Sequence, residues 1–206
     1  MKHSVVQEED ENEALKKWNK HYIRFINEIP KGSNNNINEL LHTTRTLTGS
    51  NKFFREDSMG TYTRILYQIV FQTKHWEETL TKQNRERLFT FISGILIKKE
   101  CFVYQVGGVE NHIHIITHVH PNIAVSQLVK DIKLASTALI RSERLFSHFK
   151  GWNEGFGAFT YTPEMIDNLI KYVLNQEAHH KKETAREEYL RLLREFEIKF
   201  EEKYIK

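Results

Sequence analysis

The sequence predicts an α+β fold, in which helices pack on the faces of an antiparallel β-sheet. One observation favours this class, and two others concern the core and the cellular compartment. Segments of strand composition and segments of helical spacing alternate from about residue 59 to the C-terminus. Hydrophobic residues make up 39% and aromatic residues 12% of the 206 residues, enough for a substantial core. The single cysteine, Cys101, excludes an internal disulfide, so a reducing cytoplasm is the expected compartment.

Residues 1–58 differ from the rest of the chain. They contain the polar run KGSNNNINE and the Thr-rich run HTTRTLTGS, both typical of linkers. An amphipathic helix is predicted around NEALKKWNKHYIRFINEI, where Leu15, Trp18 and Tyr22 recur at helical spacing. We therefore expect an N-terminal extension at 1–58, partly helical or linker, followed by a compact domain at 59–206.

Three stretches of this domain are expected to contain its strands, because they are rich in β-branched and aromatic residues. The first is TYTRILYQIVFQT (61–73). The second, CFVYQVGGVENHIHIITHV (101–119), is predicted to form two strands around a turn at Gly107 and Gly108. The third, GWNEGFGAFTYT (151–162), is predicted to run from a loop into a strand.

Four stretches carry apolar residues at helical spacing, and they are 81–100, 122–142, 162–183 and 183–205. Thr81 and Thr162 occupy expected N-cap positions, and Pro163 follows at the first helical position. The order of the first seven of these elements, β-α-β-β-α-β-α, is typical of an antiparallel sheet with helices on one or both faces.

The run ENHIHIITHVH (110–120) contains four histidines. On a strand, His112 and His114 point to the same face, close enough to share one cation, while the intervening isoleucine points to the core. Taken alone, the pair is equally well explained by two histidines on a solvated sheet face. His118 and His120 continue the alternation at the end of the strand, where loop or hydrogen-bonding roles are more common.

A second group of polar residues lies in IKYVLNQEAHH (170–180). Tyr172 and Gln176 are four residues apart and share a helix face, and His179 and His180 extend that face by one turn. A tyrosine supplies an oxygen nucleophile, and a glutamine amide oxygen can bind a hard cation. Taken alone, a half-buried aromatic and a solvated glutamine are the simpler explanation. No Cys-x-x-Cys, H-E-x-x-H or phosphate-binding G-x-x-x-x-G-K-[ST] motif is present.

Together and in order, ENHIHII, GWNEGFGAFTYT and IKYVLNQEAHH resemble the single-tyrosine HUH transposases, whose name stands for histidine, hydrophobic residue, histidine. The similarity is greatest to the IS200-like insertion-sequence transposases and the REP-associated tyrosine transposases. It extends from about Tyr62 to the C-terminus and leaves residues 1–58 outside. The resemblance implies the RRM/ferredoxin-like fold of HUH endonucleases.

The resemblance also implies a reaction. His112, His114 and Gln176 would bind one Mg²⁺ or Mn²⁺ ion, and this ligand set carries no charge, so the cation keeps its full attraction for a phosphate. Tyr172 would attack the DNA backbone and form a 5'-phosphotyrosine, which a later strand end resolves during DNA transposition and recombination. His179 or His180 would orient the amide or carry a proton; a helix C-terminal cap is the alternative.

Members of this family act on single-stranded DNA and recognise short hairpins at the ends of the mobile element. Basic residues that could hold a DNA backbone lie between residues 122 and 150, where the net charge is +3. The candidates for DNA binding are Lys130, Lys133, Arg141, Arg144 and Lys150, with Trp152 as a base-stacking residue. For the basic residues the alternative is a solvated helix face. Phe156 and Phe159 could also stack on bases, but core packing is the more common role for them.

The longest apolar run, FISGILI, is too short to span a bilayer, and no signal peptide precedes it, so a cytoplasmic protein without a membrane partner is expected. Related insertion-sequence enzymes are dimers and REP-associated enzymes are monomers; we expect a homodimer. Three other functions stay open. They are a catalytically idle or host-adapted nucleic-acid-binding protein, a metal-dependent nuclease that uses water, and a structural metal-binding module.

Overall fold

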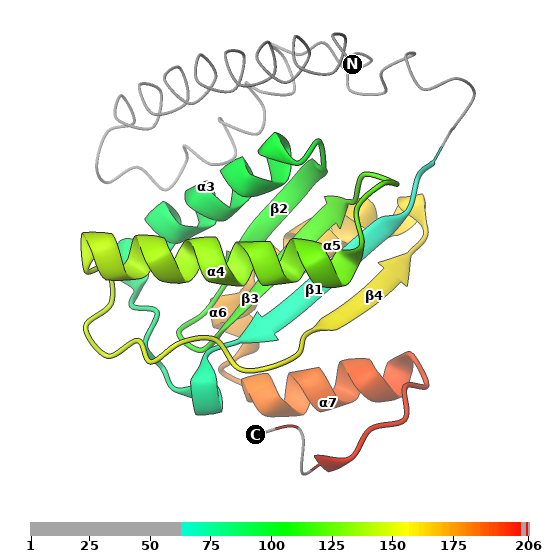
Figure 1. Ribbon diagram of the computed structural model, residues 1–206. Helices are drawn as coiled ribbons and strands as arrows, with labels where there is room; N and C mark the ends of the chain where they lie inside the picture. Colours follow the sequence, from blue (N-terminus) through cyan, green and yellow to red (C-terminus); the bar gives the residue numbers. More distant parts are fainter. Residues whose placement is uncertain (1–62, 203–204, 206) are drawn as a thin grey trace, which may run out of the picture. The chain divides into compact units, whose positions relative to one another are not determined.

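The computed structural model describes residues 63–202 and residue 205. The predictions for residues 1–58, including the amphipathic helix, lie outside the described residues. Four strands form one antiparallel sheet in the order β2-β3-β1-β4 (Figure 1). Their bounds are β1 Leu66–Gln72, β2 Phe102–Gly108, β3 His112–His118 and β4 Gly157–Tyr161. The predicted α+β class is confirmed.

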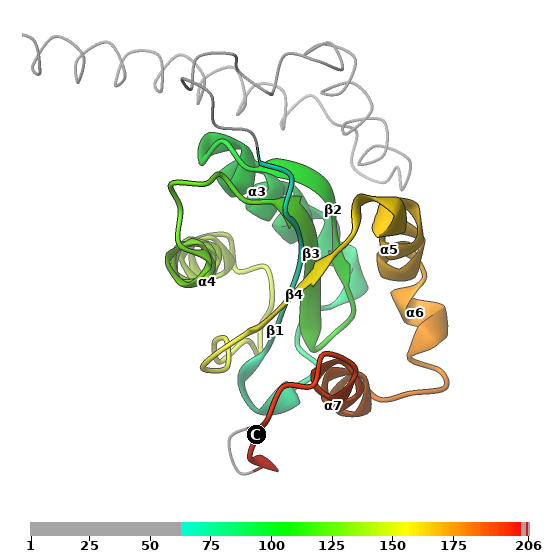
Figure 2. The same cartoon turned by 90° about the vertical axis from the view of Figure 1, so that its right-hand side faces the viewer.

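Helices cover both faces of this sheet. Figures 1 and 2 show α3 (Lys82–Lys98) and α4 (Val125–Glu143) on one face. The other face carries α5 (Ile166–Leu174), α6 (Gln176–His179) and α7 (Ala185–Glu195). Two short 3-10 helices, η1 (Lys74–Trp76) and η2 (Pro163–Met165), complete the elements. Among the described residues, no helix is long and apolar enough to cross a membrane.

Strand β3 is buried on both faces, which explains its apolar composition. Ile116 packs in a cluster with Leu169 and Val173 of α5, so the even-numbered side chains of β3 face α5, α6 and α7. His112 and His114 therefore face the same layer, and both are buried. The alternative of a solvated face for the H-x-H pair is wrong, because three helices cover it.

Two apolar clusters support the helices on this face. Leu66 at the start of β1 packs with the α5 cluster, whereas Val70 packs with Phe159 and with Tyr189 of α7. Gln68 lies between Leu66 and Val70 on the same face of the strand and is buried. The sequence of β1 thus places a polar side chain in an apolar layer, directly beside β3.

Three predicted boundaries are wrong. The helix expected over 162–183 is broken at Asn175, whose φ and ψ of −96° and 14° end α5 and precede α6. Asparagine favours such breaks because its side chain competes for backbone hydrogen bonds. The helix expected over 183–205 ends at Glu195, and Glu197 adopts a left-handed φ of 53°. The glycines at 107 and 108 end β2, and the turn follows them.

Candidate metal and nucleophile site

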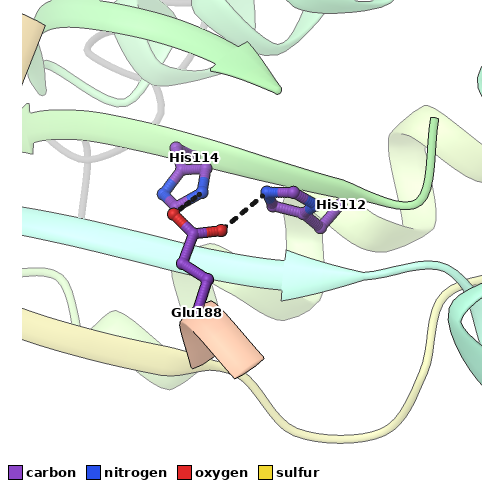
Figure 3. A group of neighbouring side chains, drawn as sticks. All are labelled: His112, His114 and Glu188. Atoms are coloured by element: carbon purple, nitrogen blue, oxygen red, sulfur yellow. Dashed lines mark ion pairs between the residues drawn. The ribbon is translucent and has the colours of Figure 1, made fainter. Parts of the chain in front are cut away.

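The buried face of the sheet brings together side chains from four elements. β3 supplies His112 and His114, α5 supplies Tyr172, the first residue of α6 is Gln176, and α7 supplies Glu188. The two histidines, Gln176 and Glu188 are each no more than 1% exposed. Figure 3 shows Glu188 extending from α7 toward both imidazole rings.

Glu188 contacts both histidines of the H-x-H pair. Its Oε2 lies 3.2 Å from His112 Nε2, and its Oε1 lies 3.4 Å from His114 Nε2. One ligand atom from each of these three residues lies within 4.8 Å of the other two, the spacing expected of groups that share one ion. The carboxylate adds a negative charge to a ligand set that the sequence predicted to be uncharged.

Gln176 and His180 complete the cluster on the side of α6. Gln176 Oε1 lies 3.1 Å from His112 Nε2 and 2.7 Å from His180 Nε2. Gln176 Nε2 donates to Glu188 Oε1 at 3.0 Å, which orients the amide with its oxygen toward the imidazoles. His180 is the C-cap residue of α6, so the predicted capping position and a contact with Gln176 occur together.

Both ring nitrogens of His180 face hydrogen-bond acceptors. Its Nδ1 donates to the carbonyl oxygen of Glu183 at 2.8 Å, and its Nε2 faces the oxygens of Gln176 and Glu188. Burial works to lower the pKa of His180, but hydrogen bonds with Glu188 and Glu183 outweigh it and raise the pKa. The protonated ring suits both contacts, because both nitrogens then donate.

His112 is held in a tautomer suited to ligation. Asn111 Oδ1 accepts from His112 Nδ1 at 2.8 Å, which leaves the lone pair on Nε2. Burial is the main reason that the pKa of His112 falls to about 4, although Glu188 opposes the shift, so the ring is neutral near pH 7. A neutral Nε2 then faces the oxygens of Gln176 and Glu188, and three electron-rich atoms converge on one point. A cation at that point would satisfy all three.

His114 is oriented from behind by β1 and β4. Its Nδ1 lies 3.0 Å from Gln68 Nε2, and Tyr161 donates its hydroxyl to Gln68 Oε1 at 2.7 Å. His114 Nε2 is buried and makes no hydrogen bond within the described part of the chain. Ligation through Nε2 requires the ring proton on Nδ1. The Gln68 amide would then have to turn over, so that its oxygen accepts from His114 Nδ1 and its nitrogen donates to the Tyr161 hydroxyl oxygen.

Glu188 is a carboxylate in this environment. Burial works to raise its pKa, but His114, His112 and His180 hold that pKa far below its usual range. Removing one partner of such a buried cluster would leave the others without compensation. A carboxylate at this buried position is stabilised by positive charge beside it.

The Tyr172 hydroxyl lies directly against this cluster. It donates a short hydrogen bond to Glu188 Oε1, and the Tyr172 ring is centred 5.8 Å from the His114 ring. Arg191 Nη2 donates to the same hydroxyl oxygen at 3.2 Å. Burial and the neighbouring Glu188 charge raise the pKa of Tyr172, and Arg191 opposes this shift. Positive charge near Glu188 would oppose this rise in the pKa of Tyr172 and would make the phenol easier to deprotonate.

Gly107 allows α5 to approach the sheet beside this cluster. It pairs with His114 across β2 and β3. A Cβ atom at position 107 would lie 2.7 Å from Val173 Cγ1 and 3.3 Å from the Val173 carbonyl oxygen. Because Val173 follows Tyr172, the absence of a side chain at position 107 sets the distance between the tyrosine and the histidines.

Most of the predicted DNA-binding residues lie away from this cluster. Four are on α4 or at its end, on the sheet face opposite the cluster (Figure 2), and these are Lys130, Lys133, Arg141 and Arg144. Lys130, Arg141 and Arg144 are exposed. Lys150 is exposed too and pairs with Glu77 at 2.6 Å. DNA contacts by these exposed residues stay a prediction.

Two members of that set have structural partners instead. Lys133 Nζ donates to the carbonyl oxygens of Asn153 and Gly155 and lies 5.3 Å from the centre of the Phe71 ring. Burial lowers the pKa of Lys133 to about 8. Trp152 Nε1 donates to Ser136 Oγ at 3.0 Å, and its ring packs on Phe71. Both residues anchor the loop before β4 through these contacts, and DNA contact by Lys133 and Trp152 stays a prediction.

The structure thus brings together the predicted His112, His114, Tyr172 and Gln176. His180 contacts Gln176, and His179 lies beside Tyr172. His179 pairs with Glu183 at 2.8 Å, and its ring is centred 5.2 Å from the Tyr172 ring. Sequence reasoning missed Glu188 and Arg191. A signal for Glu188 did exist, because an acid stands between Ala185 and Leu192 in the buried stripe of α7.

The chain is similar to a known protein family and to solved structures. The family model described as "Transposase IS200 like" matches residues 61–176, which is more than half of the chain. A comparison with curated proteins finds no match. Among solved structures, a "putative transposase" from Deinococcus radiodurans R1 is 18% identical with a TM-score of 0.47, covering 59% of this chain and 97% of its own. A REP-associated tyrosine transposase bound to a REP hairpin is 14% identical with a TM-score of 0.45, covering 59% of this chain and 74% of its own.

Proposed function

This chain belongs to the IS200-like transposase family, and on that premise we propose that it cleaves and rejoins single-stranded DNA through a covalent bond to Tyr172. The observation that carries the proposal is the contact between the Tyr172 hydroxyl and the buried cluster of His112, His114, Gln176 and Glu188. A nucleophile and a set of ligand atoms converge there from β3, α5, α6 and α7.

The cluster suits one divalent cation, Mg²⁺ or Mn²⁺. His112, His114 and Glu188 would hold it with the Gln176 amide oxygen, because their donor atoms converge and His114 Nε2 is buried without a hydrogen bond in the described chain. Oxygen donors suit Mg²⁺, and a mixture of imidazole and oxygen donors suits Mn²⁺. When bound, such an ion supplies the Lewis acid that polarises a phosphate oxygen.

The side chains of the protein would carry out the remaining chemistry. The Tyr172 oxygen attacks the phosphorus of a phosphodiester, a tyrosyl–phosphate bond forms, and the bond from phosphorus to the 3'-oxygen breaks. The phenol loses its proton and the 3'-oxygen gains one. Because the tyrosyl–phosphate bond conserves the energy of the bond that breaks, the reaction needs no ATP. Glu188 accepts the phenol hydrogen bond before the attack and thereby aims the oxygen. His180 and Gln176 hold the carboxylate in place.

Substrate and assembly belong to the proposal as well. Membership of the family favours single-stranded DNA with hairpins at the ends of the element as the substrate. The exposed basic residues Lys130, Arg141 and Arg144 of the opposite face are available for the flanking backbone. We also propose that 59–206 is the transposase domain, with 1–58 as an extension, and that the protein works in the cytoplasm.

The test is covalent capture of the phosphotyrosine. Full-length protein is mixed with labelled single-stranded oligonucleotides carrying the hairpin ends of its own genomic flanks and with Mg²⁺ or Mn²⁺, and is then denatured in detergent. We expect a shifted band that requires the cation. Tyr172→Phe should abolish it, with a loss of at least ~10³-fold, because the nucleophile itself is removed.

Controls separate the competing functions. Tyr104 is a half-buried tyrosine packed against the same α5 cluster, so Tyr104→Phe is the matched control and should leave the band intact. Cleavage that survives Tyr172→Phe without a shifted band would indicate a nuclease that uses water. Binding with neither cleavage nor adduct, on verified flanking DNA, would indicate a host-adapted binding protein and would overturn the proposal.

A further inference from the structure

Helix α7 brings a guanidinium to the oxygen atom that would be phosphorylated. Arg191 Nη2 donates to the Tyr172 hydroxyl oxygen at 3.2 Å. We infer that Arg191 is a further catalytic residue, whose guanidinium binds the phosphate while it is transferred to and from Tyr172. This inference rests on the proposed function and extends it to a residue outside the matched range of 61–176.

The fold fixes the position of this guanidinium. Glu188 and Arg191 are three residues apart on α7, so they share a helix face, and both reach Tyr172. A capping box between Thr184 and Glu187 fixes the start of the helix. Tyr189 on the adjoining face packs against the sheet. Arg191 therefore sits on a docked helix and not on a mobile surface.

Carboxylates on either side hold the guanidinium in one orientation. Glu183 accepts from Arg191 Nε at 3.0 Å and from Nη2 at 3.1 Å, and Glu195 accepts from Nη1 at 2.9 Å. Each terminal nitrogen of a guanidinium carries two hydrogens, so Nη2 can serve Glu183 and Tyr172 together. The planar group is thus oriented before substrate arrives, with one N–H directed at the nucleophile.

Phosphoryl transfer turns this contact into a contact with an anion. When the Tyr172 oxygen bonds to phosphorus and the 3'-oxygen leaves with a proton, the tyrosine oxygen becomes a bridging oxygen, and the two non-bridging oxygens beside it share one negative charge. Those oxygens come within reach of the Nη2 hydrogen that the phenol oxygen accepted before. Arginine binds phosphate oxygens through charge-assisted hydrogen bonds, which strengthen as negative charge develops.

A purely structural ion pair is the competing explanation, because Arg191 also joins the segment before α7 to the helix through Glu183. The two explanations differ in one respect. Loss of a purely structural residue should slow adduct formation by the same factor on every substrate. Loss of a residue that binds the anionic phosphate should slow adduct formation much less when that phosphate is neutral.

The experiment therefore varies the charge of the scissile phosphate. Single-turnover adduct formation is measured with an oligonucleotide that the wild type captures, and with the same oligonucleotide carrying a methylphosphonate at the cleaved linkage. We expect Arg191→Ala to slow adduct formation on the natural phosphate ~10²-fold or more, with little change in DNA affinity. On the methylphosphonate, the deficit relative to wild type should shrink to within ~10-fold.

Two further variants keep the test decisive. Arg186 lies on the same helix and is exposed, so Arg186→Ala is the matched control and should behave as wild type. Arg191→Gln keeps a donor without the charge and replaces Arg191→Ala if the latter does not fold. An equal loss on both substrates, or no loss, overturns the inference alone. Absence of any adduct with wild-type protein overturns the proposed function, and the inference falls with it.

Discussion

Glu188 shows how one residue can change the electrostatics of a site. Two histidines and a glutamine would leave the site neutral, but Glu188 adds a buried carboxylate that contacts His112, His114 and the Tyr172 hydroxyl. The same carboxylate raises the pKa of the tyrosine. A cation bound to Glu188 would remove that obstacle, because it neutralises the charge facing the phenol.

Substitution of this carboxylate should weaken cation binding. We expect Glu188→Gln to raise the Kd for Mn²⁺ at least tenfold, about 1.4 kcal/mol, because an anionic ligand becomes neutral. Titration calorimetry of the full chain at pH 7.5 measures it. Glu197→Gln, which changes an exposed glutamate beyond the same helix, serves as control and should bind as wild type. An unchanged Kd in Glu188→Gln would exclude this carboxylate as a ligand.

At the scale of elements, the distance between α5 and the sheet sets the position of Tyr172, the proposed nucleophile. Val173 rests on the bare backbone of Gly107, which pairs with His114 in the sheet. Gly107→Ala should lower the free energy of unfolding by ~1–3 kcal/mol, because the new methyl group overlaps Val173 Cγ1. It should also slow adduct formation, since α5 must move away with Tyr172.

A double-mutant cycle checks the cause. Val173→Ala removes the overlapping methyl group, so the double variant Gly107→Ala/Val173→Ala should be more stable than the sum of the single changes predicts. Urea denaturation gives the four free energies of unfolding. Strict additivity would mean that the two positions do not interact and that Gly107 acts through the flexibility of β2 instead.

The order of the elements was predictable because local composition decides it. Strand composition located the four strands, and helical spacing located most helices, including the N-cap position of Thr81. The break at Asn175 was not predictable, since the helical spacing of Tyr172 and Gln176 continues across it. Asparagine favours a break but does not require one, so packing on the sheet also decides whether such a helix stays continuous.

The candidate site was predictable only where spacing within one element revealed it. His112 and His114 alternate on a strand, and Tyr172 and Gln176 are four residues apart, so each pair carries its own signal. Glu188 and Arg191 reach the site only because α7 packs on the sheet, and no spacing within the helix predicts that packing. The basic residues of α4 were predictable as a charged helix face, but their spacing did not reveal that α4 covers the sheet face opposite the cluster (Figure 2).

For the whole molecule, the geometry determines whether one chain can complete the site. Tyr172 and the histidines meet within a single chain, and the segment that carries Tyr172, Gln176 and Glu188 is continuous from α5 to α7. We therefore expect the proposed nucleophile and ligands to act in cis, whether or not the protein forms the expected homodimer.

Complementation between two inactive variants tests this expectation. Tyr172→Phe and His114→Ala are co-expressed with different tags, purified together and assayed by covalent capture. With sites in cis, every site lacks either the nucleophile or a ligand, so no adduct should form. With sites in trans, mixed dimers would unite an intact tyrosine with intact histidines and restore roughly a quarter of the wild-type signal. Co-expression of each variant with wild type controls for dominant loss of activity, and restored capture would contradict the arrangement within one chain.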